Sequence, residues 1–220
     1  MSCQQCCGIE QTFNDASIRK QLRRFRRRGP DKTTRMLIDD LRRVLAGDAA
    51  GRATLLDVGA GLGAIHHELL DDVVSRVVHV EASPAQLAAA REETLRRGHE
   101  RVVEFLSGDF TALADQLSSA DVVTLDRVIC CFDDMERLVR LSAEKALRFY
   151  GAVFPRDLRW MRVAMSLINL VQRLKRSPFR VFLHSPRDID AKLRSSGLLR
   201  RSERHTLGWH VVVYERPISV

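Results

Sequence analysis

A hydrophobic run that ends at an acid and three alternating glycines constrains this 220-residue chain more than any other feature. The run Leu55-Leu56-Asp57-Val58 is followed by Gly59, Gly61 and Gly63. The pattern predicts a buried strand that turns sharply into a helix, because glycine tolerates the backbone angles of a tight turn. Missing side chains also let a nucleotide-like ligand lie against the backbone. The sequence therefore predicts a cofactor site at this turn.

Strand-like and helix-like segments alternate along most of the chain, which indicates a parallel sheet with helices on both faces. We expect an α/β, Rossmann-like, doubly wound fold with a mostly parallel seven-stranded sheet and a C-terminal antiparallel hairpin around Leu207-Gly208. The expected strands are 54–58, 76–81, 102–106, 121–126, 147–154, 198–206 and 209–215. The expected helices are 62–71, 84–97, 110–118, 133–145, 158–174 and 186–196.

Two further helices precede this alternation. The segments 14–28 and 31–46 have helical patterns and are separated by Gly29-Pro30, with Asp31 placed to cap the second helix. We therefore divide the chain into an N-terminal helical cap (1–50) and a cofactor-binding domain (51–220).

The first helix carries a dense basic run. Residues 19–28 hold seven basic side chains and no acid, within a chain of net charge +8, so a polyanion such as RNA is one candidate partner. Ile18, Leu22 and Phe25 recur in the same run at helical spacing. We therefore favour the interpretation that the arginines form the solvated face of a helix that packs on the domain.

The five cysteines predict reduced thiols and no metal site. Two adjacent pairs, Cys6-Cys7 and Cys130-Cys131, are poorly placed for internal disulfides. Cys3, Cys6 and Cys7 could join Cys130 or Cys131 around a metal, but no second Cys-x-x-Cys or paired His completes the usual spacing. With no uncharged apolar run of membrane length and no visible secretory signal, the expected location is the cytoplasm.

Acids mark the ends of four consecutive expected strands: Asp57, Glu81, Asp109 and Asp126. In an open parallel sheet, ligands bind beyond the carboxyl ends of the strands. Glu81 stands about twenty residues beyond the glycines, where a carboxylate can accept hydrogen bonds from ribose hydroxyls. An acid there also argues against a 2′-phosphorylated cofactor.

Two cofactor classes fit the glycines. Gly59, Gly61 and Ala64 satisfy the dinucleotide pattern G-x-G-x-x-G/A, so a nicotinamide-binding or non-catalytic protein on the same fold stays open. Asp57, however, puts negative charge where a pyrophosphate would lie, whereas a ligand with an ammonium and a sulfonium would be attracted there. S-adenosylmethionine carries both groups.

The chain resembles the class I S-adenosylmethionine-dependent methyltransferases. The resemblance lies in Leu56–Gly63, Val80-Glu81-Ala82, Gly108-Asp109-Phe110 and Asp121–Asp126. It implies that Gly59 and Gly61 line the methionine part, Glu81 holds the ribose, Asp109 meets the adenine amino group, and Asp126 with Arg127 borders the methyl-transfer site. The candidate cofactor-binding residues are Asp57, Gly59, Ala60, Gly61, Gly63, Glu81, Ala82, Asp109, Phe110, Asp126 and Arg127.

A second resemblance, to proteins grouped with magnesium-protoporphyrin O-methyltransferases, lies in Leu22–Pro30, Asp126–Cys131 and Phe154–Asp157. We carry over no catalytic residue from it. An Asn/Asp-Pro-Pro-Tyr signature for nitrogen acceptors is absent after Leu125, which favours oxygen or carbon in a small molecule, and the basic N-terminal helix could pair with its carboxylates.

Proton removal, if the acceptor needs it, has no assigned residue. The available base candidates are His66, His67, His184, Tyr150 and Asp133. We expect His66 and His67 to lie on a helix surface, and His184 could face the acceptor from a basic linker.

Overall fold

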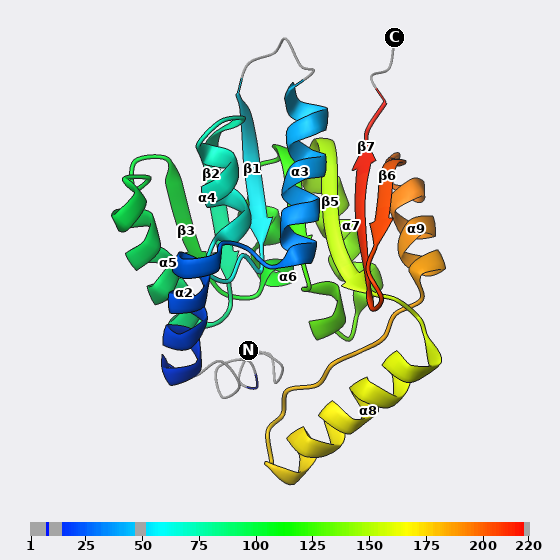
Figure 1. Cartoon of the computed structure of the whole chain (residues 1–220). Helices are drawn as coiled ribbons and strands as arrows, with labels where there is room; N and C mark the ends of the chain where they lie inside the picture. The colour runs from blue at the N-terminus through cyan, green and yellow to red at the C-terminus, as the bar shows by residue number, and fades with distance from the viewer. Residues whose placement is uncertain (1–7, 9–14, 47–51, 218–220) are drawn as a thin grey trace.

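The protein folds into a seven-stranded sheet that lies between layers of helices (Figure 1). The structure is a computed structural model that describes residues 8, 15–46 and 52–217. The strand order is β3-β2-β1-β4-β5-β7-β6. Strands β1 to β5 pair in parallel and β7 is antiparallel to both of its neighbours, which confirms the predicted fold class. The strands are β1 (Ala53–Val58), β2 (Val74–Glu81), β3 (Val103–Ser107), β4 (Ala120–Asp126), β5 (Ala146–Pro155), β6 (Leu199–His205) and β7 (Trp209–Glu215).

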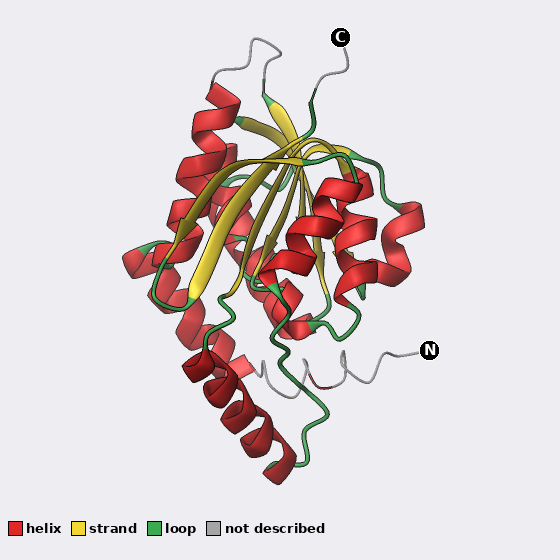
Figure 2. Ribbon diagram, turned by 90° about the vertical axis from the view of Figure 1, so that its right-hand side faces the viewer, coloured by secondary structure: helices red, strands yellow, loops and turns green. Residues whose placement is uncertain are grey.

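Helices cover both faces of the twisted sheet (Figure 2). Helices α3 and α4 share one apolar core with the sheet, and α7 and α9 share the core on the opposite face. The helices are α2 (Asp15–Arg28), α3 (Lys32–Ala46), α4 (Ala64–Leu70), α5 (Pro84–Arg97), α6 (Phe110–Leu113), α7 (Met135–Lys145), α8 (Arg159–Leu174) and α9 (Pro186–Ser195), with two short 3₁₀ helices, η1 (Ala114–Gln116) and η2 (Ile129–Cys131).

Helix α3 is packed tightly against the sheet. Leu37 and Leu41 are fully buried. A β-carbon built on Gly151 of β5 would lie 2.9 Å from Leu37 Cδ1, so the glycine lets the helix approach the strand closely. The buried face of α3 therefore packs the N-terminal region against the centre of the sheet.

Helix α2 packs on α5 through Ile18, Leu22 and Phe25, which are all buried and contact Ala89. Its basic side chains lie on the remaining surface, and Arg26 forms ion pairs with Glu92 and Glu93 of α5. The solvated-face interpretation of the basic run is thereby confirmed.

The element bounds fall close to those expected, with one exception. The expected helix 110–118 is divided, since α6 ends at Leu113, η1 follows, and Leu117 already has extended backbone angles. Leu117 is buried in the core just before β4 starts at Ala120, which leaves no length for a continued helix.

Candidate active site

A cavity of about 650 Å³ opens at the carboxyl ends of the parallel strands, between the glycine turn and α2, α3 and η2. In Figure 1 the arrowheads of these strands point to the side of the sheet on which α2 and α8 lie. Seven candidate cofactor residues line the cavity, namely Asp57, Gly59, Ala60, Gly61, Glu81, Asp126 and Arg127. The other four, Gly63, Ala82, Asp109 and Phe110, are not part of its lining.

The glycine turn after β1 has the strained geometry that its sequence predicts. Gly59 has φ +60°, its amide donates to Val80 O at 2.8 Å, and a β-carbon there would lie 2.5 Å from Val128 Cγ2. The chain can therefore turn here only without a side chain.

Glu81 closes this turn from the end of β2. Its Oε2 accepts a hydrogen bond from Gly61 N at 2.9 Å, and its Oε1 accepts one from Ser83 N at 2.7 Å. Burial raises the pKa of the carboxyl group, against the effect of these backbone donors. Each carboxylate oxygen can accept a further hydrogen bond, which ribose hydroxyls would supply. The buried acid beside the glycines thus fits a nucleoside.

Asp57 is held in a buried network. Its Oδ1 accepts from Thr124 Oγ1 at 2.7 Å, and its Oδ2 lies 3.0 Å from His66 Nδ1. Burial raises the pKa of Asp57 to about 6. The side chain therefore ties β1 to β4 and α4 directly beneath the glycine turn.

The placement of His66 and His67 corrects an expectation. Both are fully buried, and with His79 they form a cluster whose ring centroids lie 4.3 Å (His66–His67) and 5.2 Å (His66–His79) apart. Burial lowers their pKa values to about 3, 2 and 3, so all three rings are neutral near pH 7. Helical spacing alone does not say which face of the helix carries the buried side chains. The hydrogen bond between His66 and Asp57 directs the histidines toward the protein interior.

Gly63 serves this histidine cluster. It precedes α4 with φ +78°, and a β-carbon on it would lie 2.4 Å from the His66 ring. The third glycine of the motif therefore permits packing beneath the turn.

The other base candidates also lie away from the cavity lining. Tyr150 is fully buried and shares a 2.9 Å hydrogen bond with Ser142. His184 Nε2 lies 2.7 Å from Phe132 O, and the Asp133 carboxylate accepts from Asp134 N.

Among the candidate cofactor residues, Asp109 caps α6 by accepting a hydrogen bond from Thr111 N at 2.8 Å.

The far side of the cavity is built by a polar network between β4 and α3. Thr34 Oγ1 donates to Asp126 Oδ2 at 2.6 Å, and Arg127 Nε donates to Asp126 Oδ1 at 3.0 Å. Arg127 has φ +62° and also forms an ion pair with Asp31, which Arg24 contacts as well. Asp31 stands directly before α3, and its carbonyl accepts from Arg35 N.

Several lining residues escaped the sequence reasoning. They are Gln21, Thr34, Gln86, Phe179, Val181 and Trp209. For Thr34 the sequence does contain a signal, because this polar residue interrupts the apolar face of its helix. The other five residues have no such signal in their local sequence.

The thiols of Cys130 and Cys131 line the same cavity from η2, and both lie within hydrogen-bond distance of Arg127 O. Cys130 is buried and Cys131 is partly buried, on the short 3₁₀ helix that follows β4. In residues 8, 15–46 and 52–217, no group of three or more His, Cys, Asp or Glu could hold a metal ion. Cys3, Cys6 and Cys7 lie outside the described residues.

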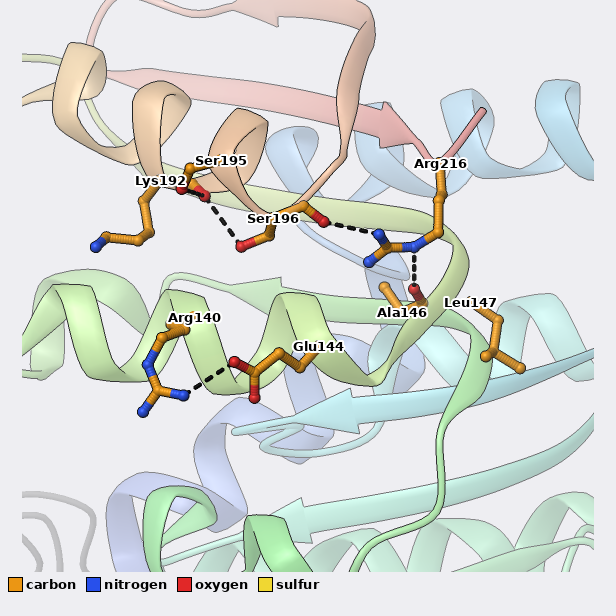
Figure 3. Close-up of a pocket in the computed structure, with 8 residues that line it drawn as sticks. All are labelled: Arg140, Glu144, Ala146, Leu147, Lys192, Ser195, Ser196 and Arg216. Atoms are coloured by element: carbon orange, nitrogen blue, oxygen red, sulfur yellow. Dashed lines mark hydrogen bonds and ion pairs between the residues drawn. The ribbon is translucent and has the colours of Figure 1, made fainter. Parts of the chain in front are cut away.

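A second hollow, of about 470 Å³, lies between α7 and α9 (Figure 3). Among the residues that line this hollow, the Arg216 guanidinium donates to the carbonyls of Ala146 and Ser196, and Arg140 forms an ion pair with Glu144. The polar groups named here are therefore paired within the protein.

Comparison with known proteins agrees with this geometry. Residues 56–151 match a family model described as methyltransferase domain. The magnesium protoporphyrin IX methyltransferase of Synechocystis PCC 6803, solved with bound SAH, superposes with TM-score 0.69 at 18% identity over 95% of this chain and 98% of that chain. No curated protein sequence matches the chain.

Two O-methyltransferase structures share the fold as well. An O-methyltransferase family protein from Burkholderia thailandensis has TM-score 0.62 at 17% identity, covering 93% of this chain and 63% of that chain. An O-methyltransferase family 2 protein from Planctomyces limnophilus, in complex with apigenin, has TM-score 0.60 at 18% identity, covering 86% of this chain and 63% of that chain.

The chain therefore carries a match to a methyltransferase domain over residues 56–151, within a seven-stranded sheet that shares the fold of the methyltransferase structures above.

Proposed function

We propose that the chain is a class I S-adenosylmethionine-dependent methyltransferase, with S-adenosylmethionine as its cofactor. We further propose that it transfers the methyl group to an oxygen or carbon atom of a small molecule. The observation that carries the proposal is the walled cavity beyond the strand ends. Its volume of about 650 Å³ lies in the range of small-molecule sites, and α2, α3 and the Phe179–Val181 segment enclose it. A polynucleotide base would have to enter past these walls, so RNA is the less favoured acceptor.

Within this cavity, the glycine side holds the cofactor and the Thr34–Asp126–Arg127 side holds the acceptor. Gly59 and Gly61 offer backbone to the methionine part, and Glu81 accepts the ribose hydroxyls. Asp109 uses Oδ1 to cap α6, and its Oδ2 has no hydrogen-bond partner in the described part of the chain, so it is available to the adenine amino group.

Methyl transfer breaks the bond between the sulfonium sulfur and the methyl carbon, and the bonding electrons stay on sulfur. A lone pair or carbanion of the acceptor would form the new bond, with S-adenosylhomocysteine as the leaving group, and a hydroxyl acceptor would release its proton to solvent. The chain contributes alignment and water exclusion, which suffice for an electrophile of this strength. Arg24 and Arg127 line the acceptor side, and an anionic acceptor would exchange with Asp31 for their guanidinium groups.

The test is transfer of labelled methyl from S-adenosylmethionine into fractionated cell extract. We expect label in small metabolites, with the new bond assigned to oxygen or carbon by mass spectrometry of the product. Glu81→Ala should abolish labelling, whereas the exposed Glu104→Gln, on the neighbouring strand β3, should not. Label confined to RNA or protein would overturn the proposed acceptor class.

A further inference from the structure

Helix α8 carries an uncovered apolar stripe. Seven of the eleven large hydrophobic side chains that are exposed among the described residues belong to this one helix. They are Trp160, Val163, Leu167, Ile168, Leu170, Val171 and Leu174, and between 45% and 77% of each is exposed. Figures 1 and 2 both place α8 at the margin of the molecule, beyond the two helix layers.

The opposite face of α8 holds the helix in place. Met161 and Met165 are buried against Cys130 and neighbouring apolar side chains. The Asn169 side chain pairs with the backbone of Val181, with Nδ2 donating to O and Oδ1 accepting from N, both at 2.8 Å. The helix is therefore anchored with its apolar stripe outward.

The charge around α8 is mostly positive, and the one acid beside its start, Asp157, already pairs with Arg162 at 2.7 Å. From residue 158 to residue 187 the sequence contains seven basic residues and no acid. Helical spacing places Arg159, Arg162 and Arg173 along one edge of the apolar stripe. Lys175 and Arg176 extend the positive charge past the C-terminal end. A helix with a large apolar face, a tryptophan and a basic border has the chemistry of anionic membrane interfaces.

The length of α8 suits a helix that lies in the plane of a membrane. Its 16 residues span about 24 Å, less than the roughly 30 Å of a bilayer core. Nowhere in the described residues is there a helix that is both long and apolar enough to cross a membrane.

We propose that α8 binds the surface of an anionic phospholipid bilayer, with its apolar stripe in the acyl boundary and its basic border on the lipid phosphates.

A second copy of the chain is the competing occupant. Trp160, Val163, Leu167, Leu170 and Leu174 recur with the three-and-four spacing of a coiled coil. In such a dimer the basic edges of α8 would face one another in either orientation. The neighbouring acid, Asp157, is already paired with Arg162, so the remaining like charges would repel. Anionic lipid carries the complementary negative charge, so we favour a bilayer over a second copy of the chain as the partner of α8.

The proposed lipid binding does not depend on the identity of the methyl acceptor. It would, however, influence which kind of acceptor can reach the cavity. Met161 and Met165 pack beside Cys130 and Trp209, which also line the cavity. A docked α8 would therefore place the acceptor side of the cavity close to the bilayer, which favours an apolar acceptor.

The test is sedimentation of the full chain with phosphatidylcholine vesicles made with and without phosphatidylglycerol. We expect binding to the anionic vesicles that weakens with salt, and little binding to neutral ones. The double variant Leu167→Glu/Leu170→Glu should lose roughly tenfold or more of the affinity, because charges would enter the apolar boundary. The matched control is Leu95→Glu/Leu147→Glu, two exposed leucines on other elements, which should bind as the native chain does.

The fluorescence of Trp160 gives a second measurement in a Trp209→Phe background, which leaves one tryptophan. Its emission should shift to the blue with anionic vesicles, and brominated acyl chains should quench it. Equal sedimentation of the native chain and the Leu167→Glu/Leu170→Glu variant would overturn the proposal. So would lipid-free dimerisation, detected by analytical ultracentrifugation, that this variant abolishes.

Discussion

Thr34 and Asp126, ninety-two residues apart in the chain, are joined by a 2.6 Å hydrogen bond in the wall of the cavity. The bond connects α3 to the carboxyl end of β4. Because the Arg127 guanidinium donates to the same threonine oxygen at 3.1 Å, the bond also orients this guanidinium in the cavity wall.

Replacement of Thr34 by valine should therefore weaken acceptor binding selectively. Loss of a hydrogen bond to a carboxylate lowers the free energy of unfolding by about 2 kcal/mol. We expect the KM for the acceptor to rise while the affinity for S-adenosylhomocysteine stays constant. Thr33→Val, at a buried neighbour without a comparable bond, is the control. An equal loss of cofactor affinity would contradict this assignment.

Glu81→Gln should weaken cofactor binding. Glutamine offers only one acceptor oxygen, so its NH₂ group would face either the Gly61 or the Ser83 amide, donor against donor. We expect the affinity for S-adenosylhomocysteine, measured by calorimetry, to fall about ten- to one-hundredfold. Glu104→Gln should bind as the native chain does, and an unchanged Glu81→Gln would remove Glu81 from the cofactor site.

The buried histidines should make the fold sensitive to acid. Their pKa values are lowered to about 3, 2 and 3, so in the folded chain they stay neutral, whereas the unfolded chain protonates them below pH 6.5. Their contribution is complete above pH 6.5 and is lost as the pH falls toward 3. Asp57 acts in the opposite sense, because its pKa is raised from 3.8 to about 6 and the folded chain binds that proton more tightly. The net uptake on unfolding is about two protons, which corresponds to roughly 3 kcal/mol per pH unit between about pH 4 and pH 6.

His79→Phe should remove one of these protons. Both ring nitrogens of His79 are buried without a hydrogen-bond partner among the described residues, so phenylalanine loses no bond there. We expect the pH dependence of the unfolding free energy, measured with urea at several pH values, to decrease by roughly 1 kcal/mol per pH unit. The exposed His205→Phe is the control. An unaltered pH dependence for His79→Phe would place the acid-sensitive groups elsewhere.

Gly63→Ala and Gly98→Ala separate backbone strain from packing. Both glycines have positive φ, +78° and +74°, so alanine costs about 1 kcal/mol at either position. Nothing lies within 4 Å of a β-carbon at Gly98, whereas at Gly63 the His66 ring lies 2.4 Å away. We expect Gly63→Ala to lower the unfolding free energy by about 1–3 kcal/mol more than Gly98→Ala does. Equal losses would show that the histidine cluster yields freely.

The local features of this protein follow from its sequence. Ser83 and Gly98 cap α5 as their positions predict, since Ser83 Oγ accepts from Gln86 N and Gly98 adopts a left-handed conformation. Interactions over a few residues decide such features, so the order of residues suffices to predict them. Helix α6 shows the limit, because burial of Leu117 in the distant core overrode its helical pattern.

The sequence by itself determined the alternation of strands and helices, the glycine turn and the acid at the end of β2. Only the tertiary structure decided that His66 and His67 turn inward, that Thr34 meets Asp126, and that α8 presents its apolar side outward. Each of these depends on which elements become neighbours in the sheet order β3-β2-β1-β4-β5-β7-β6. Residues far apart in the chain meet only after that order is established, and local periodicity carries no information about it.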